Sequence, residues 1–210
     1  MSTPTLAPRV DVRRADERFS TQIGWLDSKH SFSFGHHHDA RNTHHGLLLV
    51  NNDDVVEPGA GFETHPHHDM EIVTGAEHRH PVHFVQMWVL PEENGIVPGY
   101  EQLEIDDAAL SGGLVPVASG MPEHRDVAAI KIRNRYAALH AARLEPGRTV
   151  ELPDAPFMHL FVPRGVVALE DAGELNSGDA VRFTGTGGQR VTATDAAEIL
   201  VWEMHATVDA

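Results

Sequence analysis

The chain has 210 residues, and its 31 acidic and 16 basic residues give it a formal net charge of −15. This length allows one large or two small domains, and the acidic balance argues against direct binding to nucleic acid or to an anionic membrane. The absence of cysteine excludes disulfides and thiolate-held metal sites and fits a cytoplasmic protein, and neither a signal peptide nor a membrane span is predicted.

The first fifty residues predict short strands separated by polar turns. Residues 9–18 mix arginines with acids, so we expect a strand leading into a surface turn rather than a functional basic patch. Alternation at residues 31–34 predicts a further strand. The three histidines at 36–38 suggest a metal site, but consecutive residues of an extended chain point apart, so we favour a hydrated loop.

An apolar run at residues 47–50 predicts a strand buried on both faces, and the polar residues 51–54 predict a turn after it. Glycines at 59 and 61 then permit a tight approach to the segment that begins at His65.

The segment from His65 to residue 74 contains a His-x-His pair followed by a carboxylate four residues on. In a β-strand, side chains alternate between faces, so His65, His67, Asp69 and Glu71 would all project to one side. Two imidazoles and a carboxylate suit Fe, Mn, Ni, Cu or Zn, and the spacing does not choose among them. A polar strand edge with histidines by chance is the alternative, because the chain contains 16 histidines.

A short polar link at residues 75–81 precedes a strongly β-prone segment at 82–90, and together with the preceding strand they predict a hairpin or short crossover. Residues 106–126 hold small and polar residues suited to an irregular connection. The expected organisation is therefore a domain at 1–105, a connecting segment at 106–129 and a second domain at 130–210.

The second domain contains seven strand candidates separated by Pro and Gly turns, which favours a β-sandwich or closed barrel. The candidates are residues 138–144, 149–152, 157–163, 166–169, 180–183, 189–193 and 198–204. His140 and His159 lie within them without a His-x-His pair or a partnering carboxylate, so we expect packed or rim histidines and a domain without metal.

The His-Pro-His segment fits the first metal motif of the cupin superfamily, and within it the chain resembles the pirin family over nearly its whole length. The resemblance implies an all-β fold of two cupin-type β-barrels, a bicupin. The matching segments are residues 13–16, 25–34, 42–54, 65–71, 81–89 and 100–102.

Pirin-like proteins bind one transition metal, usually iron, in the N-terminal barrel. By position, His65 and His67 match the first two ligands, whereas the later His-x-Glu motif that supplies the other two lacks a counterpart here. In pirins this motif lies between two strands, which only residues 75–80 separate here. In addition, five or six strands are expected before residue 105, fewer than the about eight that close a small barrel. The N-terminal barrel is therefore expected to be shortened, with Glu71, His78 and His80 as candidate substitute ligands.

Several bacterial pirins act as quercetin 2,3-dioxygenases, while eukaryotic pirin is a nuclear transcriptional cofactor. The resemblance therefore implies a metal-dependent dioxygenase for a small aromatic, flavonol-like substrate, with Glu71 as the candidate catalytic base. The alternative is a non-catalytic pirin-like binding or regulatory protein with a degraded metal site.

Overall fold

The computed structural model describes residues 6–63, 65, 67, 69–77 and 81–208, and most of its regular elements are β-strands, as expected for an all-β protein. The strands are β1 (Arg9–Arg13), β2 (Phe19–Ile23), β3 (Leu26–His30), β4 (Leu48–Val56), β5 (Glu71–Glu77), β6 (Val82–Val89), β7 (Val115–Ser119), β8 (Ile130–Lys131), β9 (Ala137–Leu144), β10 (Thr149–Glu151), β11 (Phe157–Arg164), β12 (Val166–Leu169), β13 (Gly173–Asn176), β14 (Ala180–Thr184), β15 (Arg190–Ala193) and β16 (Ala197–Met204). The helices are α1 (Asp107–Gly112) and the 3-10 turns η1 (Ala15–Glu17) and η2 (Pro122–His124). None of the helices in these ranges is both long and apolar enough to cross a lipid bilayer.

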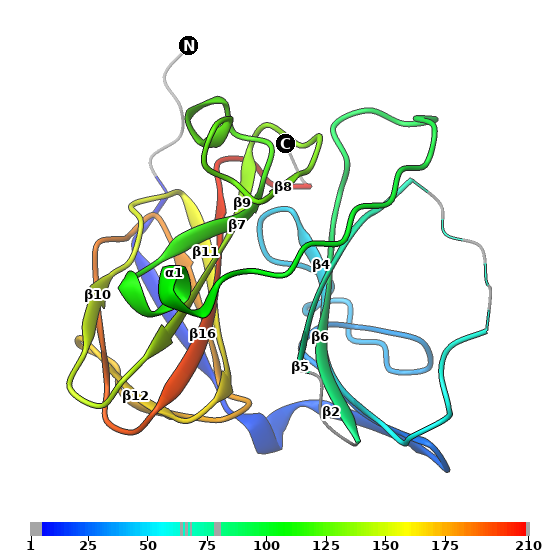
Figure 1. Cartoon of the computed structure of the whole chain (residues 1–210), viewed down its shortest axis with the longest axis horizontal. Coiled ribbons are helices and arrows are strands. Elements are labelled where there is room, and N and C mark those ends of the chain that lie inside the picture. The colour runs from blue at the N-terminus through cyan, green and yellow to red at the C-terminus, as the bar shows by residue number, and fades with distance from the viewer. Residues whose placement is uncertain (1–5, 64, 66, 68, 78–80, 209–210) are drawn as a thin grey trace.

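The strands form three sheets in two units, which lie side by side in Figure 1. The first unit is one five-stranded sheet of order β2-β3-β4-β6-β5. The second unit has a seven-stranded sheet, β1-β14-β11-β16-β9-β7-β8, and a four-stranded sheet, β10-β15-β12-β13.

The second unit has an apolar core of its own. Alternate side chains of β9, β11, β14 and β16 meet those of the four-stranded sheet in one buried cluster that includes Val181, Phe183 and Leu175, none of them accessible to solvent. Because strand residues alternate between faces, the same four strands present a second set of side chains on their outer side.

The outer face of the seven-stranded sheet packs against the first unit. Leu139, Phe161 and Trp202 of the second unit share a buried cluster with Leu48 and Met87 of β4 and β6. The Trp202 indole Nε1 donates a hydrogen bond to Met87 Sδ at 3.2 Å inside this cluster. The seven-stranded sheet is therefore covered on both faces, and the largest apolar cluster of the first unit is one that it shares with the second.

The seven strands expected in residues 130–210 are present, each within a residue or two of its predicted limits, and β8 and β13 are additional ones. Two expectations for residues 31–54 are wrong. Residues 31–34 lie outside the strands, and residues 51–54 are not a turn but the middle of β4. Polar partners at the end of β3 and directly after it stabilise these buried residues: Asn52 Oδ1 lies 2.9 Å from His30 Nδ1, and Asn51 Nδ2 donates to Ser31 Oγ at 3.1 Å.

The second unit draws on strands outside residues 130–210. Arg9 to Arg13 pair with Thr184 to Ala180, so β1 is the edge strand next to β14. Within the expected connecting segment, β7 pairs with β9. The division of the chain at 105 and 130 stays a prediction, and these pairings show that the sheets do not follow it strictly.

Candidate functional site

The His-Pro-His segment lies in the connection between β4 and β5. The expected strand is wrong for its described residues before Glu71, because His65, His67 and Asp69 have no strand pairing and β5 begins at Glu71. Asp69 adopts a positive φ of 38°, which no regular strand contains. Its carboxylate accepts a hydrogen bond from Gly95 N at 2.7 Å, which fixes this bend.

The two imidazoles of the segment are nevertheless neighbours. The ring centroids of His65 and His67 are 4.5 Å apart, and the His67 ring stands edge-on to Trp88 at 4.9 Å. His65 Nδ1 lies 2.7 Å from the Glu63 carbonyl oxygen, and both histidines are exposed. The pair is accessible to a metal ion from solvent.

Glu71 points to the other unit. One carboxylate oxygen accepts a hydrogen bond from Arg133 N, and the other accepts one from Asn134 N at 2.9 Å. Asn134 also donates from its side chain to the Leu90 carbonyl at 2.7 Å. Glu71 therefore links the start of β5 to the loop before β9.

No group of three metal-capable side chains that includes His65, His67 or Glu71 occurs within the described part of the chain. His78 and His80, the other candidate ligands, lie outside the described residues. The structure thus brings the two histidines together and directs Glu71 elsewhere.

A more complete set of donors lies in the second unit. His124 at the end of η2, His140 on β9 and Glu203 on β16 offer ligand atoms that all lie within 4.8 Å of one another. His140 Nε2 is 2.9 Å from Glu203 Oε2, and His205 Nε2 is 2.9 Å from Glu203 Oε1. Burial alone would raise the pKa of Glu203, but the hydrogen bonds to these two histidines lower it to about 2.

This group went unrecognised in the sequence because its members come from three separate elements. We expected His140 to be a packed or rim histidine, and it is indeed 7% exposed. What the sequence did not indicate is that η2 and β16 place His124 and Glu203 beside it.

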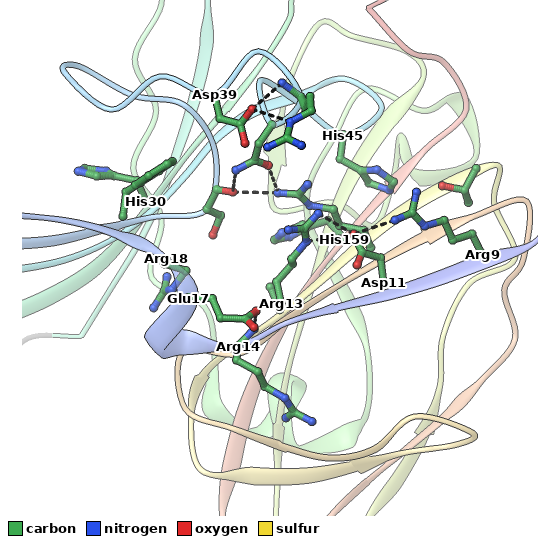
Figure 2. Close-up of a pocket in the computed structure, with 17 residues that line it drawn as sticks. Arg9, Asp11, Arg13, Arg14, Glu17, Arg18, His30, Asp39, His45 and His159 are labelled. Carbon is green, nitrogen blue, oxygen red and sulfur yellow. Dashed lines mark hydrogen bonds and ion pairs between the residues drawn. The ribbon is translucent and has the colours of Figure 1, made fainter.

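A cavity of about 550 Å³ lies between the two units, and Figure 2 shows its lining. Its floor is the outer face of β1, β14 and β11, and its walls come from η1 and the loops around β3. The lining residues are Arg9, Asp11, Arg13, Arg14, Glu17, Arg18, Phe19, His30, Ser31, Asp39, Arg41, Asn42, His45, His159, Ala180, Arg182 and Thr184. Neither His65, His67 nor Glu71 is among them.

Several groups in this cavity have shifted pKa values. Burial lowers the pKa of His45 to about 4 and that of the Arg182 guanidinium to about 10. Burial, followed by the charge of Arg182, also holds the pKa of His159 well below its usual value. Both histidines are therefore neutral at pH 7, in surroundings where further positive charge is unfavourable.

Comparisons with known proteins agree with this architecture. A family model described as Pirin matches residues 12–76, and one described as Quercetinase C-terminal cupin domain matches residues 117–204. A Mycobacterium tuberculosis protein named putative quercetin 2,3-dioxygenase is 49% identical over 235 aligned positions, which cover 94% of this chain and 96% of the relative. The Escherichia coli protein named quercetin 2,3-dioxygenase is 38% identical over 135 positions, which cover 46% of this chain and 58% of the relative.

Among solved structures, the bacterial pirin YhhW from Escherichia coli in complex with nickel(II) superposes with a TM-score of 0.82 at 27% identity. The superposition covers 95% of this chain and 100% of that one. Together with the two family models, it confirms the expected all-β bicupin fold. The chain belongs to the pirin family of bicupin proteins.

Proposed function

We propose that this protein is a pirin-type metal-binding oxidoreductase that acts on a small aromatic, flavonol-like substrate, as a quercetin 2,3-dioxygenase does. The observation that carries the proposal is the contact between His65 and His67, within the residues that match the Pirin model. The relative that is 49% identical over nearly the full length of both chains bears the same activity in its name.

The described residues fit a metal at this position in part. Two exposed imidazoles suit Fe, Mn, Ni, Cu or Zn, of which iron is the metal we expect. The Glu71 carboxylate is bound to the loop before β9 and forms no ligand group with His65 and His67, so its proposed roles as third ligand and catalytic base require it to move toward them. Two imidazoles alone hold a metal weakly, because affinity depends on ligand count and on support from surrounding groups.

In such a site the metal and the protein contribute different parts of the chemistry. A bound metal supplies the electronics for reaction with oxygen, and the protein supplies orientation and a dry surface. Here Trp88, edge-on to His67, offers an aromatic surface beside the imidazole pair. An aromatic substrate would stack or pack against such a surface favourably.

A second candidate function is a non-catalytic binding or regulatory protein with a degraded metal site. The engagement of Glu71 favours it. So does the alignment with the Mycobacterium relative, which has 235 positions against 210 residues in this chain, so the relative contains residues that have no counterpart here. We place either function in the cytoplasm, in keeping with the absence of cysteine.

Metal analysis of the purified protein after anaerobic loading with Fe, Mn, Ni, Cu or Co tests the proposal. The double variant His65→Ala/His67→Ala should lose the metal and the ability to deplete quercetin. The matched control His124→Ala/His140→Ala removes two of the three donors in the second unit and should retain both.

If only the His124→Ala/His140→Ala control loses the metal, the metal binds in the second unit and the proposed site at His65 and His67 is wrong. If every loaded form leaves quercetin unchanged, the oxidoreductase is excluded. Capture of a protein partner by such an inactive chain would then favour the binding function.

A further inference from the structure

The cavity between the two units concentrates positive charge in an acidic protein. Six arginines and three carboxylates line it. Arg14, Arg18 and Arg41 pair with Asp179, Asp53 and Asp39, so the excess charge lies on Arg9, Arg13 and Arg182, beside Asp11. A positively charged cavity in a chain of net charge −15 is not expected by chance, because acidic residues outnumber basic ones. Its arginines are therefore a candidate binding feature.

Arg182 is the centre of this charge. It is 7% exposed, and its guanidinium donates to the Ser31 carbonyl at 2.8 Å and to Asn42 Oδ1 at 2.7 Å. It also lies 4.4 Å from the centre of the Phe32 ring. These neutral groups hold the guanidinium in place without neutralising it, and no carboxylate of the described residues is in ion-pair contact with it.

The carboxylates nearest to Arg182 are already shared. Asp11 lies opposite Arg182 in the pairing of β1 with β14, yet its carboxylate contacts Arg13 at 2.9 Å and Arg9 at 3.7 Å. The Asp11 carboxylate thus pairs with two arginines, Arg9 and Arg13, and makes no ion pair with the third, Arg182. Figure 2 shows Arg9, Asp11 and Arg13 gathered beside His159, while Arg14 points away from them.

Buried nitrogen atoms without hydrogen-bond partners lie around the same cavity. They are Arg18 Nε and Nη1, Arg182 Nε and both ring nitrogens of His159, a residue only 1% exposed. Buried polar atoms that lack partners are costly, so folded proteins rarely leave several together. A buried charge without a counter-charge costs more still.

We propose that this cavity binds a small anionic molecule through a carboxylate or phosphate group placed against Arg182, Arg13 and Arg9. Arginine is well suited to such groups, because its planar fork of donors matches two oxygens of an oxyanion. The volume of about 550 Å³ accommodates a metabolite-sized molecule rather than a lone ion. The site is separate from the proposed metal position, since it contains neither His65 nor His67.

The test is a thermal-denaturation titration of the metal-free full chain with inorganic phosphate and, separately, with benzoate. At least one of these should raise the thermal midpoint in a saturable way, because a ligand that binds only the folded state stabilises it. Saturation by phosphate alone identifies phosphate esters as the ligand class, and saturation by benzoate alone identifies carboxylates.

Two variants on the cavity should change the affinity in opposite directions. Arg182→Gln should weaken binding by about tenfold or more, because it removes a charged donor. Asp11→Asn should strengthen binding by about two- to fivefold, since it removes the carboxylate that competes for Arg9 and Arg13. Arg190→Gln, a control in an exposed ion pair with Glu170, should bind like the wild type.

If neither anion gives a saturable shift, the site does not exist. Equal shifts in the wild type, Arg182→Gln and Asp11→Asn would show a general salt effect and overturn the proposal as well. If Arg182→Gln does not fold, the tighter anion binding expected of Asp11→Asn still tests the proposal. The assay contains neither metal nor flavonol, so its outcome is independent of the proposed oxidoreductase.

Discussion

The second unit encloses its apolar core between two of its own sheets, whereas the first unit has a single sheet that is buried on the second unit. Phe183 lies fully inside the second unit. On the first unit's sheet, by contrast, Ile72 at the β5 edge is 37% exposed. We therefore expect the second unit to supply most of the packing that stabilises this bicupin, and the first unit to be stabilised by its contact with the second.

Removal of a core side chain from the second unit should produce the largest loss of stability. Phe183→Ala should lower the free energy of unfolding by about 3–5 kcal/mol, because it leaves a cavity in a packed core. Ile72→Ala, at the exposed edge of the first unit's sheet, should cost less than about 1 kcal/mol. Urea denaturation measures both, and similar losses would contradict the unequal burial of the two positions.

Breaking the link made by Glu71 should have an intermediate effect. Glu71→Ala leaves the N–H groups of Arg133 and Asn134 without their acceptor, so we expect a loss of about 2 kcal/mol. Glu63→Ala, at an exposed position in the same connection, should leave stability unchanged. A variant that loses metal with no loss of stability would show that Glu71 is a ligand rather than a link between units.

Mild acidification should have the smallest effect, and it should act on the interface between the units. Because the pKa values of His45 and His159 lie below the usual 6.5, the unfolded chain binds protons that the folded chain does not, and stability falls as the pH drops below 7. Burial raises the pKa of Asp54 to about 6, which opposes this loss, since the folded chain then binds the extra proton.

Burial lowers the pKa of His30 as well, so three histidines act against one carboxyl group, and the net loss from pH 7 to pH 6 should be on the order of 1 kcal/mol. The thermal midpoint at the two pH values measures it. His45→Gln, which keeps a donor for the Phe183 carbonyl, should show a smaller decrease. A midpoint that rises on acidification would mean that Asp54 outweighs the histidines.

The strands of the second unit were predictable because their signals are local. Alternating side chains and turn residues define each strand, and Gly147 and Gly178 do adopt the positive φ values, 83° and 86°, that their turns need. β13 was missed because it is short and mostly polar, with only Leu175 buried.

The polar middle of β4 was mispredicted as a turn because its stability depends on distant partners. Asp53 contacts the Arg18 guanidinium at 2.9 Å and His83 Nε2 at 2.5 Å. Neither partner is recognisable from the composition of residues 51–54, which resembles that of many loops.

The candidate sites, too, were predictable only where their residues lie close together in the sequence. The His-Pro-His pair was found because both members lie in one short motif, although its backbone is not the expected strand. The group of His124, His140 and Glu203 and the arginine-lined cavity depend on pairings between distant strands. The arginines of residues 9–18 seemed unimportant because acids separate them, yet strand alternation places Arg9, Asp11 and Arg13 on one face toward Arg182.

The pairing of β1 with β14 also has a consequence for the order of events during synthesis. β1 leaves the ribosome first, but its partner follows about 170 residues later, on the order of 10–30 seconds at usual elongation rates. Until then β1 has no partner strand, and any fragment that begins after Arg13 leaves the β14 edge open to other chains. Removal of residues 1–13 should therefore promote aggregation of newly made protein, even though it leaves the core of the second unit intact.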